Sequence, residues 1–221
     1  MISAFILDFD GLILDTETPL IDAWVAAHAA HGRTFARERG HSVIGHHGVA
    51  FDPWEGIPDH IDRAQLEAEF VARKNEIIRP QPILPGVESL LDYARDHRIA
   101  LAVASNSFHN HVDGHLQRLG LWSRFQTIIC RDDVPHPKPA PDVYLAACAA
   151  LGVSPGEAVG FEDSVPGHVA AFTAGLPVVV VPNPSTSHCT FAHASLQLTS
   201  LDEFSPAQLA AQLNRIHAVE G

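Results

Sequence analysis

Short apolar runs recur along the chain at intervals that suit the strands of a parallel sheet. They cover residues 2–7, 99–104, 127–130, 158–161 and 178–181. Each run is short and almost wholly apolar, which is typical of strands that are buried on both faces. Stretches with helical periodicity separate the runs. These stretches begin after Gly86 and continue at residues 116–121, 143–151 and 169–174. The alternation predicts a doubly wound α/β fold, in which ligands bind beyond the carboxyl ends of the strands.

The segment between Glu17 and Pro82 interrupts this alternation. Helical periodicity runs over residues 20–30 and 61–78, with no convincing strand between them. Prolines at positions 80, 82 and 85 mark its exit, which suits a hinge. We therefore expect a helical cap domain of residues 17–82, inserted into a core of residues 1–16 and 83–221. Such a cap over the strand ends would exclude water from a site there.

The composition narrows the classes of partner. A formal net charge of −12, with only 2 Lys and 12 Arg and no clustered basic run, argues against nucleic-acid binding. The chain begins without a basic leader and has no apolar run approaching 18 residues, so we expect a soluble, cytoplasmic protein without a membrane partner. The three cysteines are widely spaced and fit reduced, buried thiols. The oligomeric state stays open, and a monomer is compatible with the composition.

Acidic residues follow directly after the first apolar run, in the sequence DFDGLILDTE. Asp8 and Asp10 lie two positions apart, so on an extended chain they project to the same side. At about 4 Å two carboxylates repel each other by roughly 4 kcal/mol at an effective dielectric constant near 20. A divalent cation bound beside them relieves this repulsion. An Asp-x-Asp pair also occurs by chance, but the preceding strand and the turn at Gly11 favour a metal site.

Polar groups that suit an anion follow later strands. Ser105 and Asn106 follow the second strand and can donate hydrogen bonds to an anion, although both residue types are also common helix caps. Lys138 lies between prolines in HPKPAPD. A rigid loop of this kind favours an aimed ammonium group over the solvated loop charge that is the usual fate of lysine.

Two further acids follow the fourth strand, in the sequence GFEDS. Glu162 and Asp163 would lie at the same edge of the sheet as Asp8 and Asp10. Carboxylate oxygens together with the backbone carbonyl of Asp10 form a suitable site for a hard cation. A capping role for Asp163 is the alternative. Because acids, hydrogen-bond donors and a lysine follow four strands of one sheet, we expect these groups to form a single site.

Together these segments resemble the motifs of the haloacid dehalogenase superfamily over essentially the whole chain. DFDGLILDTE resembles its first motif, the Ser105 segment its second, KPAPD with Lys138 its third, and FEDSVPGHVAAFTAG its fourth. The insertion resembles the helical cap of the subgroup that contains β-phosphoglucomutase, phosphoglycolate phosphatase and related sugar-phosphate phosphatases. The resemblance implies a Rossmann-like core, a Mg²⁺ ion and a phosphoaspartyl intermediate.

The resemblance also implies a role for each matching residue. Asp8 would be the nucleophile, and Asp10 the general acid and then the general base. Lys138 would neutralise the charge of the transferring phosphoryl group, and we expect Lys138→Ala to cause a large loss of turnover while folding is retained. The remaining implied roles are phosphate binding, by Ser105 and Asn106, and metal binding, by Asp8, the carbonyl of Asp10, Asp163 and, directly or through water, Glu162.

The expected activity is hydrolysis of a small phosphorylated metabolite, either a sugar phosphate or a compound like phosphoglycolate, by a Mg²⁺-dependent phosphatase. Members of the superfamily that are dehalogenases lack the second aspartate of the first motif, so Asp10 together with Asp163 argues for phosphoryl transfer. Phosphonate hydrolysis in the superfamily uses a lysine early in the cap. The cap's only lysine here, Lys74, lies near its end.

A sugar-phosphate mutase like β-phosphoglucomutase is the alternative. Leu20 stands where that enzyme carries a cap histidine, and the loop of residues 45–48 lacks its arginine, which weakens this alternative. His46, His47 and Lys74 remain candidate substrate contacts in the cap, although histidines in an exposed loop need no function. A ligand-binding module without activity is less favoured, because every catalytic position of the family is filled.

Overall fold

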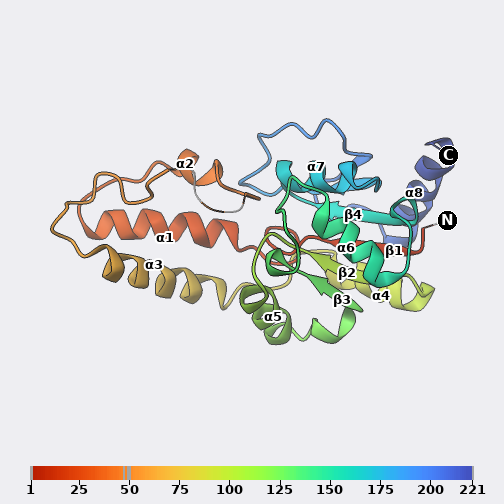
Figure 1. Cartoon of the computed structure of the whole chain (residues 1–221), viewed down its shortest axis with the longest axis horizontal. Coiled ribbons are helices and arrows are strands. Elements are labelled where there is room, and N and C mark those ends of the chain that lie inside the picture. Colours follow the sequence, from red (N-terminus) through yellow and green to blue (C-terminus); the bar gives the residue numbers. More distant parts are fainter. Residues whose placement is uncertain (1, 47, 49–50, 221) are drawn as a thin grey trace.

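The computed structural model describes residues 2–46, 48 and 51–220 of the chain. Six strands form one parallel sheet in the order β3-β2-β1-β4-β5-β6 (Figure 1). They are β1 (Ala4–Leu7), β2 (Ala100–Ala104), β3 (Thr127–Ile129), β4 (Ala158–Glu162), β5 (Val178–Val180) and β6 (Leu196–Gln197). The winding direction reverses between β1 and β4, where Phe5 pairs with Val159. In such sheets this switch point is where ligands bind, beyond the carboxyl ends of the strands.

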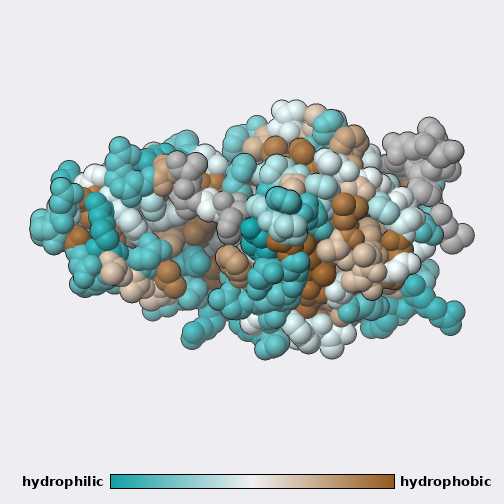
Figure 2. Space-filling view, viewed as in Figure 1, coloured by the Kyte–Doolittle hydropathy of each residue, from teal (hydrophilic) through white to brown (hydrophobic). Residues whose placement is uncertain are grey.

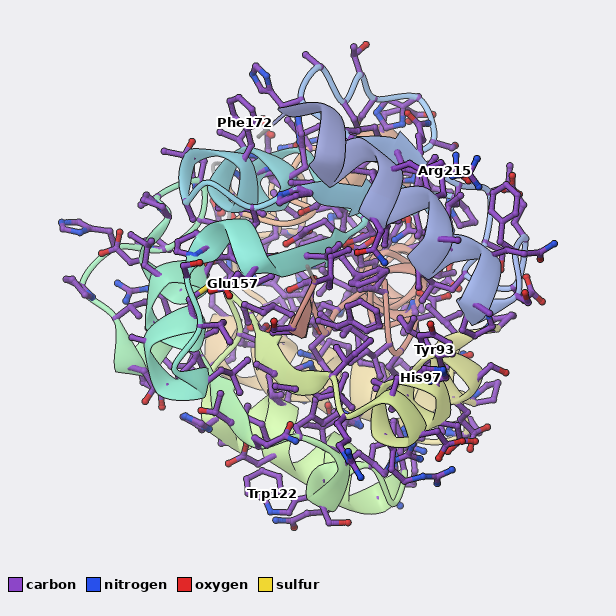
Figure 3. The ribbon with its side chains drawn as sticks, turned by 90° about the vertical axis from the view of Figure 1, so that its right-hand side faces the viewer. Tyr93, His97, Trp122, Glu157, Phe172 and Arg215 are labelled. Carbon is purple, nitrogen blue, oxygen red and sulfur yellow. The ribbon has the colours of Figure 1, made fainter. Side chains whose placement is uncertain are left out.

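Alternate side chains of β1 enter two different hydrophobic cores. Phe5 and Leu7 lie in one core and Ala4 and Ile6 in the other. The first core is covered by α4 (Val87–His97), α5 (His109–Arg118) and α8 (Pro206–Glu220). The second is covered by α6 (Asp142–Leu151) and α7 (Val165–Thr173). Figure 3 shows α4, with Tyr93 and His97, and α8 on one side of the sheet and α6 and α7 on the other. Burial of both faces explains the largely apolar strands and confirms the predicted fold class.

Three helices extend beyond the carboxyl edge of the sheet (Figure 1). They are α1 (Glu17–Ala30), α2 (Arg37–His41) and α3 (Arg63–Ile78). They enclose a hydrophobic cluster of their own, in which the Trp24 and Phe70 rings stack with centroids 5.4 Å apart and Trp54 meets Phe70 edge-on at 5.5 Å. This separate aromatic cluster supports the proposed division into a cap of residues 17–82 and a core of residues 1–16 and 83–221.

Three elements were absent from the sequence-based expectation. The short helix α2, the edge strand β6 and the final helix α8 were not predicted. In β6, Leu196 pairs with Val179, but two residues are too few to show alternation. Helix α8 contributes Leu209 and Leu213, one turn apart, to the first core. The chain also contains three short 3₁₀ helices within the described residues, η1 (Trp122–Arg124), η2 (Arg131–Asp133) and η3 (Pro155–Glu157).

Two observations bear on the expectations drawn from composition. Cys130, Cys148 and Cys189 are free thiols, the first two buried and the third partly exposed. Burial raises the pKa of the Cys148 thiol to about 11, which makes it a poor nucleophile. Among the helices of the described ranges, none combines the length and the apolar character needed to cross a membrane.

We expect Phe70→Ala to loosen the cap alone. Phe70 is buried against both cap tryptophans, so its truncation should cost about 3–5 kcal/mol of local stability. Hydrogen exchange read by mass spectrometry should accelerate in peptides from residues 17–82, with protection in β1 and β4 unchanged. Val71→Ala, an exposed change on the same helix, is the control. Equal loss of protection in the sheet would contradict a cap with its own core.

Candidate active site

The carboxyl ends of β1 and β4 bring three acids together. Asp8 directly follows β1 and is 6% exposed, while Glu162 and Asp163, at the end of β4, are fully buried. One carboxylate oxygen from each lies within 4.8 Å of the others. Gly11 turns the chain after β1 with φ of 77°, a left-handed conformation that favours glycine. The structure thus assembles these acids at the switch point, as expected.

Lys138 supplies a positive charge to this cluster. Its ammonium group donates to Asp8 Oδ1 at 2.7 Å, to Glu162 Oε1 at 2.6 Å and to the backbone carbonyl of Ala104 at 2.8 Å. The residue is 3% exposed. Burial acts to lower the pKa of Lys138, but the charges of Asp8 and Glu162 outweigh burial and hold that pKa above its usual value. The proline-flanked loop therefore directs its ammonium group into the acid cluster.

Glu162 is occupied by hydrogen-bond donors on both oxygens. Oε1 accepts from Lys138 and from the Tyr144 hydroxyl at 2.6 Å. Oε2 accepts from the backbone N–H of Asp163 at 3.3 Å and from the hydroxyl of Ser164 at 3.1 Å. With its carboxylate engaged in this way, Glu162 holds Lys138 in place. We therefore interpret it as a residue that acts through Lys138 rather than as a direct metal ligand.

Asp8 and Asp163 are the carboxylates that suit a cation. Asp163 Oδ1 is buried without a hydrogen-bond partner among the described residues, while its Oδ2 accepts from Asn183 at 2.8 Å. Burial raises the pKa of Asp163, and it acts in the same direction on the pKa of Asp8, which Lys138 opposes. A cation beside them would keep both carboxyls ionised. An incompletely partnered set of oxygen ligands fits a hard ion such as Mg²⁺.

The side chain of Asp10 is held by a separate set of donors. Its Oδ1 accepts from the Thr16 hydroxyl at 2.6 Å and lies 2.8 Å from Nε2 of His111. Its Oδ2 accepts from the hydroxyls of Ser107 at 2.6 Å and Ser105 at 3.4 Å. Burial tends to raise the pKa of Asp10, but His111 and the hydroxyls hold it well below its usual range. In this conformation the Asp10 side chain is therefore a carboxylate.

Asn106 connects three loops. Its Oδ1 accepts from the backbone N–H of Lys138 at 2.7 Å, and its Nδ2 donates to the carbonyl of Lys138 at 3.2 Å and to that of Gly45 in the cap at 3.0 Å. A Cβ at Gly45 would lie 2.6 Å from Ser164 Oγ in the core, so glycine permits this close approach. These hydrogen bonds occupy the side chain of Asn106 between cap and core. We therefore expect its loop to contact phosphate through the backbone instead.

A cavity of about 630 Å³ lies over these groups, between cap and core. Asp8, Asp10 and Ser105 line its core side. His46 and Lys74 line its cap side, so the structure brings these two cap candidates to the site. His47 lies outside the described residues. A cavity of this size and polarity suits a phosphorylated metabolite.

Sequence reasoning missed several residues that hold the site. Tyr144 and His111 reach it from the first turns of α6 and α5, where an aromatic or a histidine leaves no local signal. Asn183 follows β5 and donates both to Asp163 and to the buried Glu17, at 2.6 Å in the second case. A polar residue after a strand is the signal that identified the other groups, and it could have identified Asn183. Burial also raises the pKa of Glu17, which lines the cavity.

Fold and site together define a class of protein: an α/β enzyme with an acid and lysine centre at the switch point of its sheet. Residues 2–175 match the family model described as haloacid dehalogenase-like hydrolase. The chain therefore belongs to this family, and the predicted Rossmann-like core is confirmed by the strand order.

The chain is also similar to individual phosphatases over nearly its whole length. It is 38% identical to "Putative phosphatase YhcW" of Bacillus subtilis (strain 168), covering 97% of this chain and 99% of the relative. It is 30% identical to hexitol phosphatase B of Escherichia coli (strain K12), with 94% and 96% covered. The crystal structure of CbbY from Rhodobacter sphaeroides in complex with phosphate matches with a TM-score of 0.78 and 29% identity, covering 97% of this chain and 100% of that one. These matches confirm the enzyme class, a phosphoric monoester hydrolase.

The deep burial of Lys138 changes the expectation that its removal leaves folding intact. Lys138→Met should lower the free energy of unfolding by about 3–5 kcal/mol, because it leaves two buried carboxylates without their cation. Lys74→Met, which removes an ammonium without a hydrogen-bond partner among the described residues, should change it by less than about 0.5 kcal/mol. Urea denaturation of both variants measures the difference. A Lys138→Met variant as stable as the wild type would contradict the ion cluster.

Proposed function

We propose that the protein is a Mg²⁺-dependent phosphatase that hydrolyses a small phosphorylated metabolite through an aspartyl-phosphate on Asp8. The observation that carries this proposal is the contact of Lys138 with Asp8 beneath a cavity whose opposite wall is the cap. The similarity to a hexitol phosphatase favours a phosphorylated carbohydrate or polyol as substrate. The proposed cap of residues 17–82 closes the cavity and restricts the access of water.

In the first half of the proposed reaction, a carboxylate oxygen of Asp8 attacks phosphorus. A bond from this oxygen to phosphorus forms as the ester bond breaks. The alcohol leaves with a proton from the protonated form of Asp10, a form that the negative charge of the bound substrate would favour over the carboxylate of this conformation. Lys138 fixes the orientation of Asp8 and adds positive charge next to the transferring group. A Mg²⁺ ion held by Asp8, Asp163 and the carbonyl of Asp10 would supply the charge that offsets repulsion between the carboxylate and the phosphate dianion.

In the second half, Asp10 takes a proton from the water that hydrolyses the aspartyl-phosphate. The hydrogen bonds to Asp10 from Thr16, Ser107 and His111 favour its carboxylate form, which is the form that this step needs. Ser105 and the backbone of its loop are proposed to bind phosphoryl oxygens. Glu162, through Lys138, and Asn106, through the loop that carries Lys138, are proposed to act as positioning residues.

Phosphate release is the measurement that tests this function. A panel of hexose phosphates, polyol phosphates, phosphoglycolate and nucleotides should include substrates that are hydrolysed with Mg²⁺ and not with EDTA. Asp8→Asn removes the nucleophile and should lower kcat by at least about 10⁴-fold. Asp22→Asn, a change in an exposed ion pair of α1, is the matched control and should retain activity.

Two results would contradict the proposal. Turnover by Asp8→Asn at the wild-type rate would remove Asp8 as the nucleophile. Absence of phosphate release from the whole panel, with isomerisation of β-glucose 1-phosphate instead, would assign the mutase reaction to this site.

A further inference from the structure

A second cavity, of about 450 Å³, adjoins the first on the side of α3 and α5. The two cavities share Lys74, Asn110 and His111 in their linings. Figure 1 shows the C-terminal end of α3 next to α5, so that the cap forms one wall of this second cavity and the core the other. We call it the seam pocket.

The seam pocket is basic in a chain with a net charge of −12. Lys74, Arg79 and Arg118 carry its positive charge. Of its two histidines, His111 lies 2.8 Å from Asp10, and burial lowers the pKa of His115. No carboxylate lines it among the residues that the structure describes. Two acids on the same helices, Glu76 and Asp113, are engaged by Arg73 and His109. Figure 2 shows hydrophilic residues over the region of α5. Within the described residues, the charges of Lys74, Arg79 and Arg118 are therefore not neutralised by an acid of the pocket.

The charged groups of the seam pocket are also short of partners. Within the described part of the chain, the side chains of Lys74 and Arg79 make no hydrogen bond or ion pair. Arg118 donates only to the backbone carbonyl of Gln81, at 3.4 Å. Arg73, which is on α3 but outside the pocket, is paired with Glu76 at 3.1 Å. Unpaired cations that converge on one cavity are the usual protein contribution to phosphate binding.

The pKa of His115 is set mainly by burial, with smaller effects from the charges around it. Burial lowers the pKa of His115 to about 4, and the charges of His111, Arg118 and Lys74 act in the same direction. These charges come from both walls, since Lys74 belongs to α3 and Arg118 to α5. Without an anion between them, like charges of the cap and the core face each other across the seam.

We propose that the seam pocket binds a phosphate dianion, in addition to the phosphoryl group at Asp8, and that this dianion joins α3 of the cap to α5 of the core. Its source is the second phosphate of a bisphosphorylated substrate or free inorganic phosphate. The first source rests on the proposed function and is favoured by the shared lining, because one ligand can extend from Asp8 into the seam pocket. The dianion and the basic side chains of α3 and α5 would then neutralise each other, which would stabilise the closed arrangement of cap and core.

The test compares the double variant Arg79→Gln/Arg118→Gln with Arg73→Gln, a matched change on α3 outside the pocket. Calorimetric titration with inorganic phosphate should detect two sites in the wild type and in Arg73→Gln, and one in the double variant. In kinetic assays, the double variant should lose at least tenfold in kcat/KM for fructose 1,6-bisphosphate, with at most a twofold change for fructose 6-phosphate. Both arginines are exposed, so circular dichroism should confirm that the variants fold.

The two arms separate the sources of phosphate. Two-site binding without a preference for the bisphosphate assigns the pocket to free phosphate and supports the proposal. One site in the wild type, or equal losses in Arg73→Gln and the double variant, overturns it. If no phosphoester is hydrolysed, the proposed function fails, and the titration alone still decides whether the seam pocket binds phosphate.

Discussion

The buried contact of Lys138 with Asp8 and Glu162 is the constraint on which the rest of the site depends. An ion moved out of water costs several kcal/mol unless partners compensate it. Here one ammonium compensates two carboxylates, at 2.7 and 2.6 Å. One positive and two negative charges leave a negative charge in excess, and the buried Asp163 adds to it. Burial raises the pKa of Asp163 and of Asp8, so the fully ionised centre that the proposed function needs would require a further cation. This requirement would link stability to function.

Hydrogen bonds connect this centre to the surrounding loops and to the cap. The Tyr144 hydroxyl and the Ser164 hydroxyl complete the hydrogen bonds of Glu162, while Lys138 donates to both Glu162 and Asp8. Asn106 ties the loop of Lys138 to the cap at Gly45. The position of the cationic group is thus coupled to the position of the cap. Closure over the cavity and orientation of the nucleophile depend on the same hydrogen bonds.

Much of this arrangement could be predicted from the sequence, because a parallel sheet brings all of its carboxyl strand ends to one edge. That rule identified Asp8 and Asp163, and Lys138 was identified by its proline-flanked loop. Tyr144 and His111 could not be found in this way, since each reaches the site from a helix and only the packing of that helix decides where its side chain lies. For the same reason, the sequence could not show that hydrogen-bond donors occupy both carboxylate oxygens of Glu162. The edge strand β6 was missed because two residues carry no periodicity.

The distribution of charge explains how an acidic chain can accept an anionic substrate. Negative charge is concentrated beneath the cavity, where Lys138 and the proposed Mg²⁺ ion would offset it. In the seam pocket, Lys74, Arg79 and Arg118 form a positive rim and have no acidic partner among the described residues. A phosphate approaching the cavity first meets this positive rim. Because the rim is divided between cap and core, an anion held there lowers the repulsion between the two walls. The charge of the substrate would then favour closure of the cap while the substrate is positioned for attack. Binding of the substrate would therefore also exclude water from the site.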